Sequence, residues 1–215
     1  MLRIHYLPGE HWVTDAEAAA VQTVAEETVE EARRSLPLLH QDLYVVVHQT
    51  PAVLPSGDGG FTLGPQVIRW DVDPALGIAD VAKKALRPTL LHEAHHAARL
   101  TLRPSDSALT TWENAAVFEG LATVFATEQT GFKPPWTEYD PSSIAAWTTE
   151  LFAQAIGEDA SDWRFRHPDG RENIVYKVGS WIVERATQAS GRTAAELVGA
   201  TEHEVMALAG LAPNE

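Results

Sequence analysis

The spacing of apolar and polar residues predicts strands near the start of the chain and helices nearly everywhere after residue 77. Short runs that alternate, or that are continuously apolar and bounded by turn residues, are typical of strands. A loop rich in proline and glycine is predicted at 51–60. The predicted strands span residues 2–6, 42–49, 61–63 and 66–72, the last two paired about Gly64-Pro65.

Helical periodicity appears in three places. A capping box, Thr14 with Glu17, opens a predicted helix that ends near Ser35. The period returns near Ile78, where Pro88 either kinks the helix or starts a new one. Beyond residue 104 the predicted helices span residues 111–129, 142–156, 173–189, 193–199 and 202–210.

This order of elements predicts an α+β fold. A small mixed sheet with its helices forms an N-terminal lobe of about residues 1–103, and a mostly helical lobe follows at about 104–215. The chain has 215 residues, of which 45% are hydrophobic, so it is long enough to bury one substantial core. We therefore expect the two lobes to form a single catalytic domain.

Composition and charge narrow the classes of function. A formal net charge of −14 argues against nucleic acid or an anionic membrane as partner, because both repel an acidic surface. The absence of cysteine excludes disulfides and thiolate zinc ligands. No apolar run is long enough for a signal peptide or a bilayer span, so we expect a cytoplasmic protein.

The chemistry of the chain is concentrated at residues 92–96, His-Glu-Ala-His-His, which fit the pattern His-Glu-x-x-His. Positions i and i+4 lie on one face of a helix, so His92 and His96 can bind one zinc ion through their imidazoles. Glu93 lies beside that face, where a carboxylate can act as a base on water. The alternative is a polar stripe on an exposed helix. The apolar flanks of the motif count against it.

Glu119 is the candidate third ligand. It lies in the strongly apolar predicted helix 111–129. Burying a carboxylate there costs roughly several kcal/mol unless its charge is compensated. A zinc ion would compensate it; a solvent-facing strip or an arginine partner are the alternatives. Glu113 has another explanation, since with Thr110 as N-cap it completes a capping box. Gly120, unfavourable inside a helix, indicates close approach of another backbone.

The connection between the two helices agrees with a shared site. A turn at 105–107 is short, and short loops favour antiparallel helix pairs, which would bring Glu119 alongside His96. Three protein ligands and one open position are the pattern of a catalytic zinc site. We therefore expect one Zn²⁺ per chain.

These motifs resemble the gluzincin clan of metallopeptidases. The likeness is strongest to uncharacterised bacterial proteins described as predicted Zn-dependent proteases, and it covers roughly residues 40–190. Those proteins combine the His-Glu-x-x-His helix with a Glu-Gly-Leu-Ala helix, here at 119–122, and a later Tyr-x-x-Gly helix, here at 176–179. The resemblance implies a zincin-like fold with zinc in a cleft between the lobes. It also makes Tyr176 the candidate donor to the oxyanion, with His167 as the second candidate; plain core packing is the alternative role of Tyr176.

The chain departs from the family pattern at two positions. Phe118 stands where gluzincin aminopeptidases have asparagine, and there is no Gly-x-Met-Glu-Asn motif, which argues against aminopeptidase activity. Thr123 stands where the thermolysin-like pattern has an aspartate, so the partner of the zinc histidines is unassigned. In gluzincins the sheet edge beside the motif helix receives the substrate. Residues 66–72 are the expected edge, and an ordinary covered strand is the alternative.

Three functions fit the sequence. The first is an endopeptidase-like zinc metallopeptidase that cleaves a peptide or small protein with Glu93 as general base. The second is a zinc hydrolase of a non-peptide amide, which would use the same residues. The third is a non-enzymatic zinc-binding or interaction protein. Glu93 argues against the third, because a structural zinc site has no use for an adjacent base.

Overall fold

The protein is described by a computed structural model that covers residues 1–51, 54–157 and 159–211. The chain divides into two compact units, Met1–Leu102 and Arg103–Glu215. Strands and helices occur together in the first unit, and the described part of the second consists of helices and connecting loops. The predicted α+β class is confirmed.

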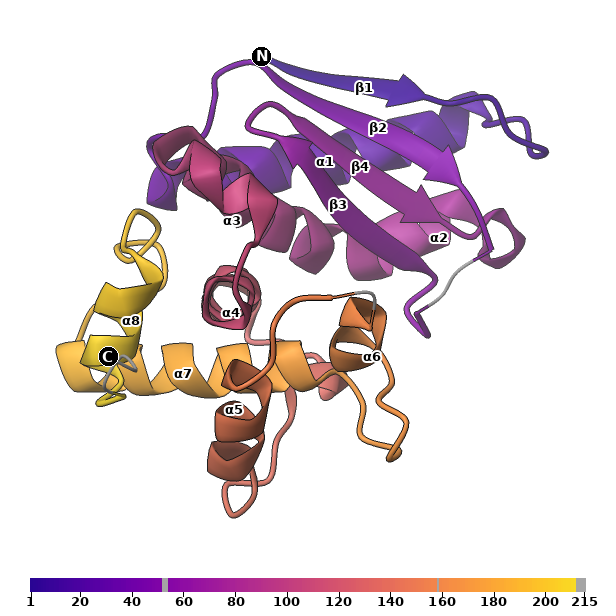
Figure 1. Ribbon diagram of the computed structural model, residues 1–215. Coiled ribbons are helices and arrows are strands. Elements are labelled where there is room, and N and C mark those ends of the chain that lie inside the picture. Colours follow the sequence, from indigo (N-terminus) through magenta and orange to yellow (C-terminus); the bar gives the residue numbers. More distant parts are fainter. Residues whose placement is uncertain (52–53, 158, 212–215) are drawn as a thin grey trace. The chain divides into compact units, whose positions relative to one another are not determined.

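The first unit contains a four-stranded mixed sheet (Figure 1). Its strands are β1 (Leu2–Tyr6), β2 (Leu43–Gln49), β3 (Asp58–Gly64) and β4 (Val67–Val72). Their order in the sheet is β1-β2-β4-β3. The pairs β1–β2 and β2–β4 are parallel, whereas β3 and β4 form an antiparallel hairpin. All four predicted strands are present, and the sheet is mixed as expected.

Helices cover one face of this sheet (Figure 1). They are α1 (Asp15–Ser35), α2 (Ile78–Val81) and α3 (Arg87–Leu102), with a short 3-10 turn at Pro74–Leu76 before α2. The inward side chains alternate along the strands, as a half-covered sheet requires. The fully buried ones are Leu43, Val45, Val47, Ile68, Trp70 and Val72.

The starts of two helices follow from local sequence. Thr14 and Glu17 form the predicted capping box of α1. Residues Ala82–Leu86 wind as a π-helix directly before α3. Pro88 has no N–H to donate to the preceding turn, which accounts for a widened turn at this point. The proline therefore lies in the first turn of α3.

Two predictions about the sheet were wrong. Part of the predicted loop 51–60 belongs to β3, which begins at Asp58; residues 52 and 53 of that loop lie outside the described residues. The start of β3 is held by tertiary hydrogen bonds of Asp58, which apolar periodicity does not reveal. Residues 66–72 are also not the edge, because β4 lies between β2 and β3. The outer strand on that side is β3.

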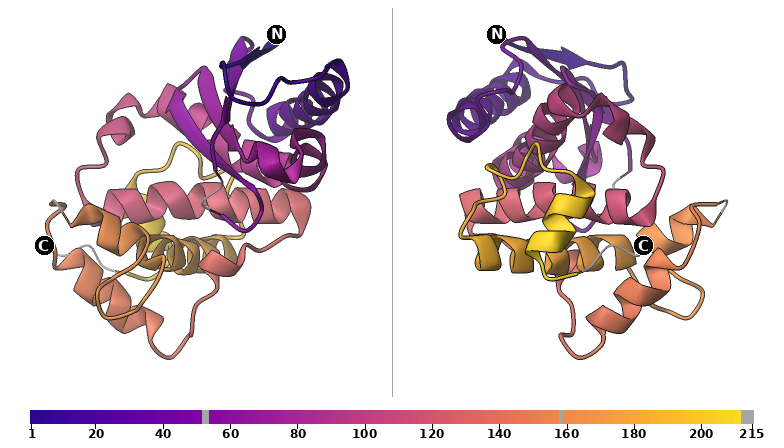
Figure 2. Two further views of the ribbon diagram at one scale, coloured as in Figure 1. Left: turned by 90° about the vertical axis from the view of Figure 1, so that its right-hand side faces the viewer. Right: turned by 60° about the vertical axis from the view of Figure 1, so that its left-hand side comes forward.

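The longest helices of the second unit are α4 (Trp112–Thr130) and α7 (Ile174–Ser190), which pack side by side (Figure 2). A Cβ on Gly120 would collide with the backbone of Gly179, and a Cβ on Gly179 would collide with the backbone of Ala116. The predicted close approach at Gly120 is confirmed. The other helical elements are Pro104–Ala108, Pro135–Thr137, α5 (Ile144–Phe152), α6 (Ala160–Arg164) and α8 (Glu202–Leu208).

Two helix starts in this unit differ from the prediction. The N-cap of α4 is Thr111, whose hydroxyl accepts a hydrogen bond from the Asn114 N–H at 3.1 Å, so the predicted box of Thr110 with Glu113 was wrong. Residues 193–199 form turns instead of the predicted helix, although Glu196 accepts a hydrogen bond from the Thr193 N–H at 2.8 Å. Few residues separate this cap from the next loop. A helix that short forms too few hydrogen bonds to offset the cost of starting it.

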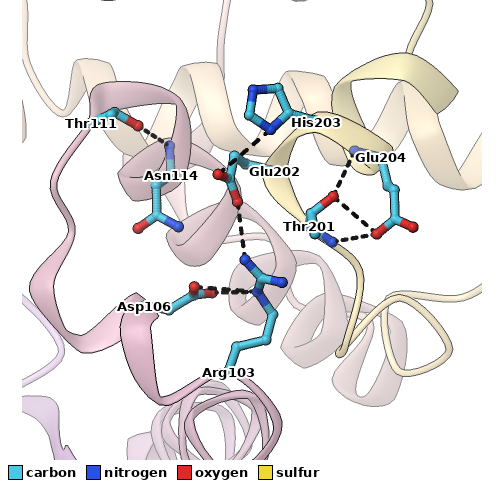
Figure 3. Close-up of polar contacts among 8 residues, drawn as sticks. All are labelled: Arg103, Asp106, Thr111, Asn114, Thr201, Glu202, His203 and Glu204. Atoms are coloured by element: carbon cyan, nitrogen blue, oxygen red, sulfur yellow. Dashed lines mark hydrogen bonds and ion pairs between the residues drawn. The ribbon is translucent and has the colours of Figure 1, made fainter.

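The segment before α4 is tied to α8 by charge (Figure 3). The Arg103 guanidinium pairs with the buried carboxylate of Asp106 at 3.2 Å and with Glu202, in the first turn of α8, at 3.3 Å. Thr201 and Glu204 form the predicted capping box of α8. Among the described residues, no helix combines the length and the apolar character needed to cross a membrane.

Candidate metal centre

Helix α3 brings the two histidines of the motif together. The Nε2 atoms of His92 and His96 lie 3.0 Å apart, with ring centroids 4.6 Å apart and ring planes at 87°. Tetrahedral zinc with Zn–N bonds of about 2.0–2.1 Å holds its nitrogens about 3.3 Å apart. The two imidazoles therefore nearly have the spacing of two zinc ligands.

Glu93 lies on a different side of α3, against strand β3. Its side chain is only 5% exposed. The Thr62 hydroxyl is 2.8 Å from Glu93 Oε2 and 2.9 Å from the Glu93 carbonyl oxygen. A Cβ on Gly60 would lie 2.6 Å from Glu93 Cγ and 2.7 Å from Oε1. Strand β3 therefore encloses the carboxylate of Glu93, the residue that follows His92 in the motif.

A second buried carboxylate attaches β3 to the start of α3. Asp58 is 4% exposed. Its Oδ2 accepts hydrogen bonds from Trp70 Nε1 at 3.0 Å and from the Thr89 hydroxyl at 2.8 Å. Sequence reasoning missed both Asp58 and Thr62, since neither belongs to a motif or to an apolar period. The glycine-rich stretch around Asp58 was the one signal that a backbone approaches closely here.

Glu119 lies on α4 and is 8% exposed, which rules out the solvent-facing strip. Within the described part of the chain, one group of three side chains could hold a metal ion. It consists of His92, His96 and Glu119, whose candidate ligand atoms all lie within 4.8 Å of one another. These are the three residues that the sequence nominated.

The other histidine of the motif and the two candidate oxyanion donors differ in their surroundings. His95 is fully buried. Tyr176 is half-buried on α7, one turn before Gly179. His167 lies between α6 and α7, with its ring 4.6 Å from that of Trp163 and its Nδ1 2.9 Å from Asp169. As oxyanion donors, Tyr176 and His167 both stay predictions.

The loop that leads into α7 is held by an arginine. Arg171 pairs with Glu150 on α5 at 2.6 Å and with Asp169 at 2.7 Å. Hydrogen bonds from Arg171 hold the pKa of Asp169 and of Glu150 below the ordinary values of these carboxyl groups. The Arg171 guanidinium also lies over the Trp147 and Trp163 rings, at 5.4 and 5.9 Å from their centroids.

A family model described as "Predicted Zn-dependent protease (DUF2268)" matches residues 76–207. The chain belongs to this family. The match to the predicted Zn-dependent proteases includes the motif helix α3 and the helices α4 and α7, whereas the four strands precede it. No curated protein and no solved structure matches the chain. The family description gives zinc dependence and protease activity as predictions, and for this chain they are likewise predictions.

Proposed function

We propose that the protein is a zinc-dependent metallopeptidase of the gluzincin type that hydrolyses internal bonds of a peptide or small protein. The observation that carries this proposal is the group formed by His92, His96 and Glu119, with a buried glutamate next to the first histidine. The family description supports the same activity.

The chemistry of the donor set fits zinc. Two neutral imidazoles and one carboxylate are a ligand set that catalytic zinc sites use, with one coordination position left open. His92, His96 and Glu119 would hold the ion. When bound, zinc would polarise the carbonyl of the scissile bond and make water more acidic. A site that only stabilises the fold would not need Glu93 beside it.

In the proposed reaction, Glu93 accepts a proton from the attacking water and delivers it to the leaving amine. Tyr176 donates a hydrogen bond to the carbonyl oxygen as negative charge develops there. The packing of α4 on α7 supports this role, because Gly120 and Gly179 bring the turn that carries Glu119 close to the turn that carries Tyr176. His167 is the alternative donor.

Metal analysis combined with peptide-library cleavage tests the proposal. We expect about one zinc per chain in the wild type and in Glu93→Gln, and loss of zinc in His92→Ala and Glu119→Ala. Cleavage by Glu93→Gln should fall by at least about 100-fold, because the general base is lost. His203→Ala is the matched control, since this histidine is 69% exposed on α8.

The outcomes separate the three candidate functions. Equal cleavage by the wild type and Glu93→Gln would contradict the assignment of Glu93 as the base. A wild type that binds zinc and cleaves no peptide would favour hydrolysis of a non-peptide amide or a non-enzymatic role. A wild type that binds no zinc would contradict the metal centre itself.

A further inference from the structure

We infer that strand β3 positions the catalytic base. The Thr62 hydroxyl and the missing side chain of Gly60 together fix where the Glu93 carboxylate points. This inference rests on the proposed function, because it takes Glu93 to be the base. Thr62 is a positioning residue in this scheme, since it acts on Glu93 and not on the substrate.

Thr62 contacts Glu93 at two atoms. Its hydroxyl lies within hydrogen-bond distance of both the side-chain Oε2 and the backbone carbonyl of Glu93, at 2.8 and 2.9 Å. Both oxygens are acceptors and the hydroxyl has one proton, so Thr62 donates to one of them at a time or shares the proton between them. A buried carboxylate held in this way has fewer rotamers open to it than one that faces solvent.

Gly60 leaves the space that the Glu93 side chain occupies. A Cβ on Gly60 would meet the Glu93 side chain and the methyl group of Thr89, at 2.6 and 2.8 Å. The φ of Gly60 is not in the left-handed region, so the backbone conformation itself would accept any residue. An added Cβ would therefore have to displace the side chain of Glu93 or Thr89, for reasons of space and not of backbone conformation.

Strand β3 is itself fastened to β4 and to α3. Asp58 joins the beginning of β3 to Trp70 on β4 and to Thr89 on α3 through a buried carboxylate. Because the sheet alternates, Asp58, Gly60 and Thr62 share the face that lies against α3. The contacts of Glu93 are thus made by a strand that is fastened to the motif helix near the start of that helix.

The neighbouring glycine supplies a matched control. A Cβ on Gly59 would meet no atom within 4 Å. Gly59 and Gly60 are consecutive residues of the same strand, so Gly59→Ala and Gly60→Ala make the same change in strand propensity. They differ in whether the new methyl group reaches Glu93.

The kinetic test compares four variants in the zinc-loaded protein. Thr62→Val keeps the shape of the side chain and removes its hydroxyl, whereas Thr62→Ser keeps the hydroxyl. We expect Thr62→Val and Gly60→Ala to lower kcat by about 10- to 100-fold with KM little changed, since a displaced catalytic group costs rate more than binding. Thr62→Ser and Gly59→Ala should stay within about threefold of the wild type, and all four should keep one zinc per chain.

A second measurement avoids activity altogether. The midpoint of thermal unfolding of the metal-free protein is measured for Thr62→Val, for Glu93→Ala and for the double variant. If the two side chains interact, the unfolding midpoint of the double variant falls by less than the sum of the decreases in the two single variants. Strictly additive losses would show that the hydroxyl does not hold the carboxylate.

Failure of the inference differs from failure of the proposed function. Cleavage that Glu93→Gln abolishes but Thr62→Val leaves unchanged would overturn the positioning role and keep the peptidase. Loss of cleavage in Thr62→Ser equal to that in Thr62→Val would also overturn it, because the hydroxyl would then not matter. A wild type that cleaves no peptide would instead overturn the proposed function, while the unfolding measurement would still decide whether Thr62 holds Glu93.

Discussion

At the scale of single residues, buried carboxylates organise the first unit. Asp58 and Glu93 are both almost inaccessible to solvent, and both have hydroxyl donors within 3 Å. A buried carboxylate is tolerated only where donors or charges compensate for lost hydration. The hydrogen bonds of Asp58 fasten a strand to a helix, and the hydroxyl of Thr62 holds Glu93 against β3.

The role of Asp58 can be measured by stability. Asp58→Ala leaves the donors of Trp70 and Thr89 without their acceptor inside the protein. We expect it to lower the free energy of unfolding by about 3 kcal/mol in chemical denaturation. Asp42→Ala is the control, because the Asp42 side chain is 58% exposed, and should change it by less than about 0.5 kcal/mol. Equal effects of the two variants would mean that the Asp58 network adds no stability.

At the scale of elements, the crossing of α4 and α7 depends on two glycines. The backbones come so close at Gly120 and Gly179 that neither position has room for a Cβ. Close backbone approach fixes the register of the two helices, because a shift along either axis would place a side chain at the crossing. The turns that carry Glu119 and Tyr176 are thereby held near each other.

Whether Gly120→Ala stabilises or destabilises the protein tests this crossing. In a free helix, Gly→Ala stabilises by about 1 kcal/mol. Here Gly120→Ala should destabilise by roughly 1–3 kcal/mol or more, because the methyl group would overlap the backbone of Gly179. A stabilising effect in thermal or chemical unfolding would contradict the close approach.

The loop before α7 should respond to acid. The pKa of Glu150 and that of Asp169 are lowered by hydrogen bonds from Arg171, so their contribution to stability is present above the unfolded-state pKa of about 4. It is lost as pH falls through the lower folded-state values. The unfolding midpoint of Glu150→Gln should thus lie below that of the wild type at pH 7, and the difference should shrink below about pH 4.

The measurement needs a control carboxylate outside this cluster. Glu138 is exposed, in the loop after Pro135–Thr137. Glu138→Gln should give a midpoint close to that of the wild type at both pH values. A pH-independent deficit in Glu150→Gln would mean that side-chain packing, not charge, accounts for its effect.

At the scale of the whole molecule, the proposed metal couples to folding. A ligand that binds only the folded protein stabilises it by about 2.7 kcal/mol at a free concentration 100 times its Kd. Adding zinc to the metal-free protein should raise the unfolding midpoint, and a chelator should reverse the rise. The effect should weaken in acid, because zinc binding competes with protonation of its ligands.

The His92→Ala variant is the reference for this experiment. It should unfold at nearly the same temperature with and without zinc, since one of the three ligands is missing. A zinc-dependent rise that persists in His92→Ala would place the stabilising ion elsewhere in the protein.

Much of the architecture could be read from local patterns. The four strands, the α1 and α8 capping boxes and the long helices α3, α4 and α7 follow from periodicities and caps that involve residues only a few positions apart. Two predictions from local caps were wrong. The N-cap of α4 is one residue later than predicted, and residues 193–199 form turns although their capping residues interact.

The sequence by itself determined the motif helix and the identity of the candidate ligands. His92 and His96 are neighbours through helix geometry alone, and Glu119 drew attention as a carboxylate in an apolar helix. Only the tertiary structure decided which strand is outermost and what surrounds Glu93. Thr62 and Glu93 are 31 positions apart, so their hydrogen bond depends on how β3 is brought against α3. No local pattern encodes such a contact, because its energy is gained only after the chain between the two residues has closed into a loop.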